Sequence, residues 1–478
     1  MRKRARIMAA ALGAAVAFSL VLGGCGSKTE DEGGAPAASP ASAGAPAAAS
    51  TAPEVKKDPV KLKMTFWGSP QEKTAVESAV KKFSEKLSYV SVEATQIPES
   101  DYDAKIAAMV ASNDAPDYGY IHGQQGEEFA KEGKFINWFE QLGKDSELKK
   151  EDFVDGVWFT LDPSNAWAVN TAVESFGLFY NKELFKEAGV AEPPAKYDEA
   201  WTWDQFLDAA KKLTLDKNGK NAADPAFDPN NIKQFGVSFE NWYGPVSVHV
   251  INNGGDYISA DGKSFALDKP EATNALQKLA DLINVHHVAP SPIQAKAIPG
   301  QAPALQAKMI AMSMFGQWIN LDLGAANVNY GVAALPKMDG NSGTIFISGA
   351  STMFKTTKNF DEAWAFAKFM TGEGVESLYE NGLWMPILKK YYTDPGLKAK
   401  WVGPNAAHPA GFEDAFIDMV MNHSKPAIIY YVKNQAKIDA MVNTALDPVW
   451  AGKKSAADAM KELAPQIAPE IQGRYDVQ

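Results

Sequence analysis

The sequence predicts an α/β fold with a parallel sheet, and three neighbouring stretches carry this prediction. Residues 60–66 alternate apolar and polar side chains as a strand does, residues 76–87 place apolar side chains at helical spacing, and residues 89–96 return to a strand pattern. A strand, helix, strand order favours parallel pairing, because the helix supplies the long connection that parallel strands need. The loops after parallel strands meet at one edge of the sheet, so we expect a ligand site there.

Length and composition limit the class of protein. The chain has 478 residues, of which 46% are hydrophobic and 22% charged, and this is enough for two or three globular domains. The net charge of −11, with no basic run after the N-terminus, argues against nucleic acid as the main partner. The chain contains 12 tryptophans, whose flat apolar faces suit the C–H faces of sugars as well as protein cores.

The N-terminus has the pattern of an export signal. The basic start MRKRAR is followed by an apolar stretch, residues 7–22, which at about 16 residues is short for a membrane-spanning helix. The Leu-x-Gly-Cys sequence that ends at Cys25 resembles the lipobox of bacterial lipoproteins, in which the cysteine is acylated. We therefore expect residues 1–24 to be a lipoprotein signal peptide and Cys25 to be lipidated. The alternative is a signal peptide that ends near a cysteine by chance.

Residues 25–58 are predicted to be a disordered tether. Residues 35–53 contain only Ala, Pro, Ser, Gly and Thr, and such a composition cannot bury a core. The tether would connect a lipid anchor to a folded body that begins near residue 59. Because Cys25 is the only cysteine, no disulfide and no cysteine ligand for a metal are expected in that body.

Polar and aromatic residues follow the first predicted strands. The first candidate loop comes directly after the strand at 60–66, and a helix capped by Ser100 is expected over residues 101–112. A short strand then leads into a second polar loop, before a helix over residues 127–132. His122 in this loop is either a ligand contact or a satisfied loop histidine. The candidates in the two loops are Trp67, Ser69, Gln71, His122 and Gln124.

The second part of the chain repeats the strand and helix pattern. Residues 173–180 read as a strand and residues 181–185 as the helix that leaves it, and the capping box that starts at Thr202 opens another helix. Residues 309–314 suit a buried strand, which leaves Trp318 just beyond its end. Trp318 either directs its ring into a cleft or belongs to the core.

Several short motifs, none specific alone, occur in a shared order over residues 60–386 and together resemble the family 1 extracellular solute-binding proteins. This is the maltose-binding type that serves ABC importers. Beside the lipobox, the motifs are Ala115-Pro116-Asp117, Ala172-Val173-Glu174-Ser175 running into Phe179-Tyr180-Asn181-Lys182, Trp201-Thr202-Trp203-Asp204, Gly254-Gly255, Gly316-Gln317-Trp318, Tyr330-Gly331-Val332-Ala333-Ala334-Leu335-Pro336 and Asp361-Glu362-Ala363-Trp364-Ala365-Phe366.

The resemblance implies a two-lobed, periplasmic-binding-protein-like fold of type II, with the ligand in a cleft between the lobes and several hinge crossings. We expect the first crossing near residues 169–171 and the return near residues 315–321. The expected first lobe comprises residues 59–170 and 319–380, and the second comprises residues 171–318 and 381–478. Closure about the hinge would be a population shift driven by ligand contacts to both lobes.

The resemblance also implies site residues. Trp318 matches the tryptophan that maltose-binding relatives place under a sugar ring, and Glu174 matches an acidic residue at the first crossing. The Gln124-Gln125 pair stands where the maltose binder has Asp-Arg, and Ile121 replaces its tryptophan, so a ligand other than maltose is expected. The further candidates are Trp67, Ser69, Gln71 and His122 from the first lobe, Asn241, Trp242 and Asp256 from the second, and Trp384 from a returning loop.

We therefore expect a monomeric, lipid-anchored receptor on the extracytoplasmic face of the cell membrane. It would bind a carbohydrate, most simply an oligosaccharide, and present it to an ABC transporter permease, with no cofactor, metal or chemistry of its own. One alternative is a secreted glycoside hydrolase, although no motif singles out two carboxylates. The other is a receptor for a peptide, polyamine or phosphorylated glycerol, which would need a strongly charged pocket, whereas the candidate loops are mostly neutral. Residues 216–228 form either a calcium loop or a turn-rich surface loop.

Overall fold

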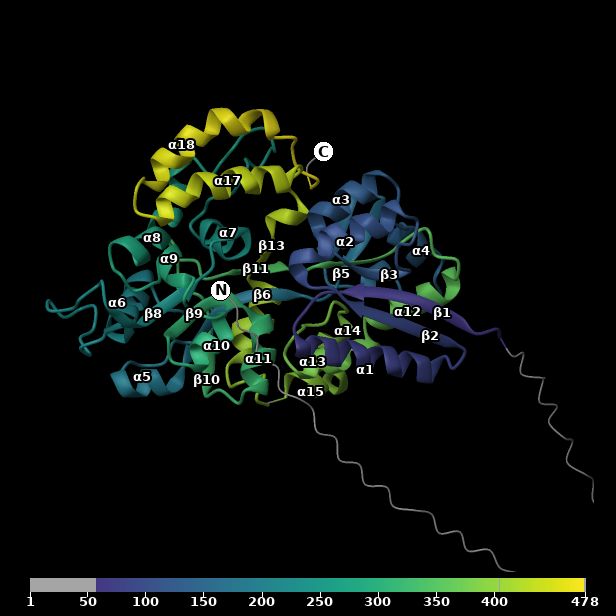
Figure 1. Ribbon diagram of the computed structural model, residues 1–478, viewed down its shortest axis with the longest axis horizontal. Helices are drawn as coiled ribbons and strands as arrows, with labels where there is room; N and C mark the ends of the chain where they lie inside the picture. Colours follow the sequence, from purple (N-terminus) through teal and green to yellow (C-terminus); the bar gives the residue numbers. More distant parts are fainter. Residues whose placement is uncertain (1–56, 404, 477–478) are drawn as a thin grey trace, which may run out of the picture. The chain divides into compact units, whose positions relative to one another are not determined.

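Two β-sheets, each covered by helices, organise the folded body (Figure 1). The computed structural model describes residues 57–403 and 405–476, so the expected signal peptide, Cys25 and nearly all of the tether lie outside the described residues. The expected α/β class is confirmed. We call each sheet with its helices a lobe, and number the lobes in the order in which the chain enters them.

The first lobe contains a sheet of six strands in the order β2-β1-β3-β12-β5-β4. β1 pairs in parallel with β2 and β3, as the strand, helix, strand pattern predicts, whereas β12 is antiparallel to both β3 and β5. The strands are β1 (Val60–Phe66), β2 (Val90–Gln96), β3 (Tyr118–Ile121), β4 (Trp158–Asp162), β5 (Asn165–Asn170) and β12 (Ala350–Met353). The helices are α1 (Pro70–Lys86), α2 (Glu99–Ala111), α3 (Gly123–Lys131), α4 (Trp138–Lys144), α12 (Phe360–Met370), α13 (Glu376–Glu380), α14 (Lys390–Thr393) and α15 (Pro395–Val402).

The second lobe contains a sheet in the order β13-β11-β6-β9-β8-β7, with β10 also paired to β6. Near its centre lies β9, whose mostly apolar sequence IAMSMFG is buried along its whole length. The strands are β6 (Glu174–Asn181), β7 (Leu215–Asp216), β8 (Ile232–Phe239), β9 (Ile310–Gly316), β10 (Tyr330–Ala333), β11 (Thr344–Ile347) and β13 (Ser424–Pro426). The helices are α5 (Lys182–Ala188), α6 (Trp203–Leu213), α7 (Tyr243–Asn252), α8 (Pro270–Asn284), α9 (Pro292–Ala295), α10 (Gln301–Gln306), α11 (Asn320–Ala325), α16 (Met419–Asn422), α17 (Gln435–Trp450) and α18 (Ala456–Ile467).

The chain crosses between the sheets three times. It leaves the first sheet after Asn170 and enters the second at Glu174, then returns between Ile347 and Ala350. The return expected at residues 315–321 is therefore too early along the chain, because β10 and β11 follow it and both pair with β6. Residues 381–402 differ from expectation in the same way, since α15 packs on α13 and α13 packs on α1 in the first lobe. The last crossing precedes β13.

Helix starts show which local signals were strong. The capping box at Thr202 is confirmed, because its hydroxyl accepts the N–H of Gln205 while the Gln205 side chain accepts the N–H of Thr202. Ser100 does not cap α2, which begins one residue earlier, after Pro98. α3 begins at Gly123, so Gln124 lies in its first turn and not in a loop.

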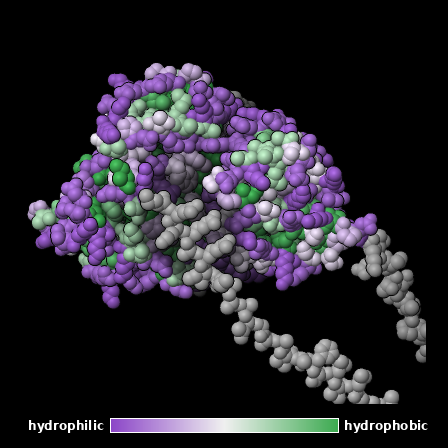
Figure 2. All heavy atoms as spheres, viewed as in Figure 1, coloured by the Kyte–Doolittle hydropathy of each residue, from purple (hydrophilic) through white to green (hydrophobic). Residues whose placement is uncertain are grey.

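Hydrophilic residues predominate on the face shown in Figure 2. The large apolar side chains exposed among the described residues are few and lie apart in the sequence: Val285, Ile293, Phe360 and Met421. Isolated apolar residues of this kind are normal on a water-facing surface. Within residues 57–403 and 405–476, no helix combines the length and the apolar character that crossing a membrane requires.

Candidate functional site

A cavity of about 680 Å³ lies where the strands of both sheets end, a size in the usual range for a small-molecule site. Trp67 follows β1 and His122 follows β3 in the first sheet, while Glu174 opens β6 and Trp318 follows β9 in the second. Two crossings, residues 171–173 and 348–349, also contribute to its wall. The expectation that strand ends form the ligand site therefore matches the position of this cavity.

The cavity brings together eight of the eleven residues that the sequence singles out. From the first lobe and its returning loop they are Trp67, Ser69, His122, Gln124 and Trp384, and from the second they are Glu174, Trp242 and Trp318. The outermost two, Trp67 and Trp384, are more than three hundred residues apart in the sequence, so their convergence is a property of the fold.

Three of the predicted site residues lie outside the cavity lining, and each has a structural reason. Gln71 is exposed on α1, because that helix begins at Pro70 and turns the next residue, Glu72, inward instead. Asn241 is exposed beside Trp242. Asp256 is held elsewhere: its carboxylate is 3.2 Å from the Arg474 guanidinium and accepts a 2.9 Å hydrogen bond from the Tyr431 hydroxyl. These three residues therefore do not line the cavity.

Aromatic rings form the first-lobe wall. Trp67 stacks on His122 with ring centroids 4.3 Å apart, and it meets the edge of Tyr102 at 4.8 Å and of Tyr120 at 5.1 Å. His122 is fixed in turn by Asp103, whose carboxylate oxygen lies 2.7 Å from Nδ1. Trp67 is therefore held on several sides and can present a rigid ring to a ligand.

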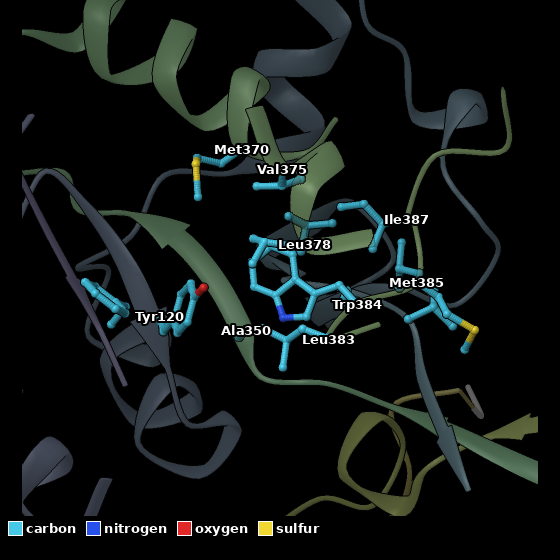
Figure 3. Packing of buried hydrophobic residues seen from close by; sticks show 14 of the residues in the cluster. Tyr120, Ala350, Met370, Val375, Leu378, Leu383, Trp384, Met385 and Ile387 are labelled. Carbon is cyan, nitrogen blue, oxygen red and sulfur yellow. The ribbon is translucent and has the colours of Figure 1, made fainter. Parts of the chain in front are cut away.

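Trp384 closes the inner end of this wall. It is 4% exposed and packs among Leu378, Leu383 and Ala350, with its ring facing Tyr120 at a centroid distance of 6.0 Å (Figure 3). Most of its surface therefore belongs to the core, and only an edge reaches the cavity.

Two tryptophans form the second-lobe wall. The rings of Trp242 and Trp318 lie 6.4 Å apart at an angle of 36°, and both contact Phe176. Each ring lies across a glycine: a Cβ at Gly316 would come within 2.0 Å of Trp318, and a Cβ at Gly244 within 2.1 Å of Trp242. Because a side chain at either position would collide with the ring, glycine is needed there for the two tryptophans to lie where they do.

Six carboxylates also line the cavity, and the sequence prediction included only one of them, Glu174. The six are Glu72, Glu99, Asp103, Glu174, Glu240 and Asp322, whereas no lysine or arginine contributes to the lining. Among the described residues the only ion pair of any of the six is that of Asp103 with His122. The expectation of mostly neutral candidate loops is therefore wrong for the cavity as a whole.

Burial changes the protonation of these acids. It raises the pKa of Glu72 to about 8 and that of Glu174 well above its ordinary value, and the negative charge of Glu72 raises the pKa of Glu174 further. Burial also raises the pKa of Glu240, which accepts a 2.9 Å hydrogen bond from the Trp242 indole, and of Asp322. Several cavity acids therefore hold protons more tightly than they would in water.

Most of these acids were not predicted from the sequence, because acidic residues at helix starts are common in any protein. Glu72, Glu99 and Asp322 lie in the first turns of α1, α2 and α11, where acidic side chains stabilise any helix through its dipole. Only the placement of those helix starts around one cavity distinguishes these acids from many others.

The loop at residues 216–228 has the geometry of a turn-rich surface loop. The Asp216 carboxylate accepts backbone N–H bonds from Asn218, Lys220 and Asp228, at 2.8 to 3.1 Å. These amides already occupy the oxygens that a calcium ion would need. Within the described residues, no cluster of three or more His, Cys, Asp or Glu side chains could hold a metal ion.

Comparisons with known proteins agree with this architecture. An ABC substrate-binding protein from Listeria monocytogenes, solved in complex with cycloalternan, superposes with a TM-score of 0.73 at 21% identity, covering 86% of this chain and 99% of that one. The maltose-bound MalE3 of T. maritima superposes with a TM-score of 0.67 at 19% identity, covering 85% and 99%. These likenesses confirm the two-lobed, periplasmic-binding-protein-like fold.

Sequence comparison gives the family. A binding protein of Brucella abortus (strain 2308) is 27% identical over 226 residues, or 46% of this chain, and the match spans about half (50%) of that relative's length. The family model described as bacterial extracellular solute-binding protein matches residues 67–376, which is more than half of the chain. The chain therefore belongs to the bacterial extracellular solute-binding protein family, whose members are receptors and not enzymes.

Proposed function

We propose that the protein is the receptor of an ABC importer, that it binds an oligosaccharide in the cavity between its lobes, and that it delivers this ligand to a permease. The observation that carries the proposal is that aromatic rings from both lobes line one cavity, Trp67 from one lobe and the neighbouring Trp242 and Trp318 from the other. Flat rings suit the C–H faces of sugars, and the polar side chains between them can pair with hydroxyl groups.

The solved relatives support a carbohydrate ligand. One was solved with cycloalternan and another with maltose, and both have the fold of this chain over nearly their whole length. The eight predicted residues in the cavity include those that the resemblance places under or beside a sugar, Trp318 first among them.

The crossings between the lobes suit a hinge. Thr171 and Ser348, on neighbouring crossings, have hydroxyl oxygens 2.7 Å apart, and the Thr171 N–H donates to the Gly349 carbonyl at 2.9 Å. A ligand that touches both walls would favour the closed arrangement of the lobes, which is the form that a permease would recognise.

The proposed test is thermal melting of residues 59–478 with a panel of mono- and oligosaccharides, peptides and polyamines, followed by calorimetry with any ligand found. A ligand at 100 times its Kd should add about 2.7 kcal/mol to the free energy of unfolding. Trp318→Ala should weaken binding by about 30- to 100-fold, because a stacked ring contributes about 2–3 kcal/mol. Gln71→Ala is the matched control and should bind normally, since Gln71 lies outside the cavity lining. Equal affinity in both variants would contradict the proposed site.

We also propose that Cys25 anchors the receptor to the outer face of the cell membrane. The support is the lipobox-like sequence that ends at Cys25 and the apolar stretch before it. The full-length protein should partition into detergent, and Cys25→Ser should move to the aqueous phase with unchanged ligand binding. An unchanged detergent partition in Cys25→Ser would contradict lipid anchoring at this residue.

A further inference from the structure

The cavity is lined by acids for which it offers no lysine or arginine partner. Four of the six cavity acids, Glu72, Glu174, Glu240 and Asp322, are buried or half-buried, and Glu99 and Asp103 are more exposed. No lysine or arginine in the lining balances them, and the nearest histidine, His122, is already engaged by Asp103. The cavity therefore holds six acids and no lysine or arginine that could balance them when they ionise.

With a neutral sugar in the closed cavity, the buried acids would stay protonated, because nothing beside them would balance their charge. When the lobes close, water leaves and each ionised carboxylate must find a donor or take up a proton, because an unpaired buried charge is strongly unfavourable. Sugar hydroxyls can donate one hydrogen bond each, but they bring no positive charge. A protonated amine brings three donors and the charge as well.

A second observation at the same place points to a ligand. The Tyr120 hydroxyl is buried, lines the cavity beside Trp67 and Trp384, and has no geometrically complete hydrogen bond among the described residues; its interaction with the Glu72 carboxyl nevertheless lowers the pKa of that acid. Buried hydroxyls are normally paired, so a polar group of the bound ligand is the natural partner for this one.

Helix stability alone does not explain the acids. Glu174 opens a strand and Glu240 lies in the loop before α7, so neither is at a helix start. Glu72 is at a helix start, but its carboxylate lies over Gly68, where a Cβ would be 1.8 Å away, and is buried instead of facing water. An exposed carboxylate would stabilise α1 equally well.

We propose that the oligosaccharide ligand is basic: a glycan with at least one protonated amino group, which the cavity carboxylates pair with while the tryptophans stack on its rings. This inference rests on the proposed function and narrows its substrate class. The rings also favour a positive charge directly, since a cation over a tryptophan face is stabilised. A bare metal ion does not fit, because the described residues offer no cluster of three ligands for one.

The test uses matched ligands and the protein of residues 59–478. Calorimetry near pH 6.5 compares glucosamine and galactosamine oligomers with their N-acetylated and hydroxyl counterparts of the same length, with spermidine as the amine that lacks a sugar ring. We expect the amino sugars to bind at least tenfold more tightly than their N-acetylated and hydroxyl counterparts. Tenfold is about the gain in affinity expected from one charge-assisted hydrogen bond. Glu72→Gln and Glu174→Gln should each reduce that preference about tenfold, whereas Glu77→Gln, an exposed acid on the same helix, should not.

The possible outcomes separate the basic-glycan inference from the proposed carbohydrate receptor on which it rests. Tighter binding of a neutral or N-acetylated glycan overturns the inference and leaves the proposed carbohydrate receptor intact. Binding of spermidine alone overturns both the basic glycan and the carbohydrate class. No measurable binding of any amino sugar also overturns the inference. Proton release on amino-sugar binding supports the inference, because an ammonium group would ionise acids that hold protons in the empty cavity. This release would be seen as a binding heat that depends on the ionisation enthalpy of the buffer.

Discussion

Gly316→Ala should weaken ligand binding nearly as much as Trp318→Ala, with an affinity loss of about 30-fold. The backbone of Gly316, at φ −76° and ψ 148°, is acceptable to alanine, so the substitution causes no strain by itself. A Cβ there would come within 2.0 Å of two atoms of the Trp318 ring, and the ring would have to leave its place. Calorimetry with the ligand found in the melting screen measures the effect.

The control is a glycine with open space around it. A Cβ at Gly143, in α4, would meet nothing within 4 Å, so Gly143→Ala should retain affinity and stabilise the helix by about 0.5–1 kcal/mol. Full affinity in Gly316→Ala would show that the Trp318 ring is not the platform on which the ligand rests.

The free energy of unfolding of the empty receptor should fall by at least about 2 kcal/mol as the pH rises from about 6.5 to 8. Glu72, whose pKa is raised to about 8, and Glu174, whose pKa is raised well above its ordinary value, keep their protons in the folded state and lose them in the unfolded state. The folded state therefore binds more protons across this window, and its stability falls with pH until the folded pKa is passed.

Urea unfolding at several pH values measures this slope. Glu72→Gln and Glu174→Gln should each flatten it, while Glu77→Gln should leave it unchanged. Buried His249 and His408, each with a pKa lowered to about 4, act in the opposite sense, but only below about pH 6.5. A slope that persists in the double glutamine variant would mean that these carboxyls ionise normally in the folded protein.

Much of the fold could be predicted from local sequence patterns. The strand at 60–66, the capping box at Thr202 and the buried strand ending before Trp318 all depend on nearest neighbours along the chain. The order of strands could not be predicted in the same way. β10 and β11 look like any short apolar strands, and only their pairing with β6 assigns them to the second lobe.

The cavity residues, too, could be predicted only in part from the sequence. Its tryptophans stand out in the sequence because they are large flat rings in the predicted loops, and Trp67, Trp242 and Trp318 line one cavity in the structure. Its acids do not stand out, since Glu72 and Asp322 look like ordinary helix-start residues. Their convergence depends on long-range contacts that no local pattern contains.

The position of β12 has a consequence for how the chain acquires its structure. Ala350 pairs with Ile121 on one side and Asn170 on the other, so β12 fills the gap between β3 and β5 of the first sheet. During synthesis the first sheet cannot be completed until about three quarters of the chain has been made. Until then, β3 and β5 each have an edge with no partner strand. Such distant pairing slows folding and exposes aggregation-prone edges, so a fragment that ends before residue 350 should be the form most dependent on chaperones.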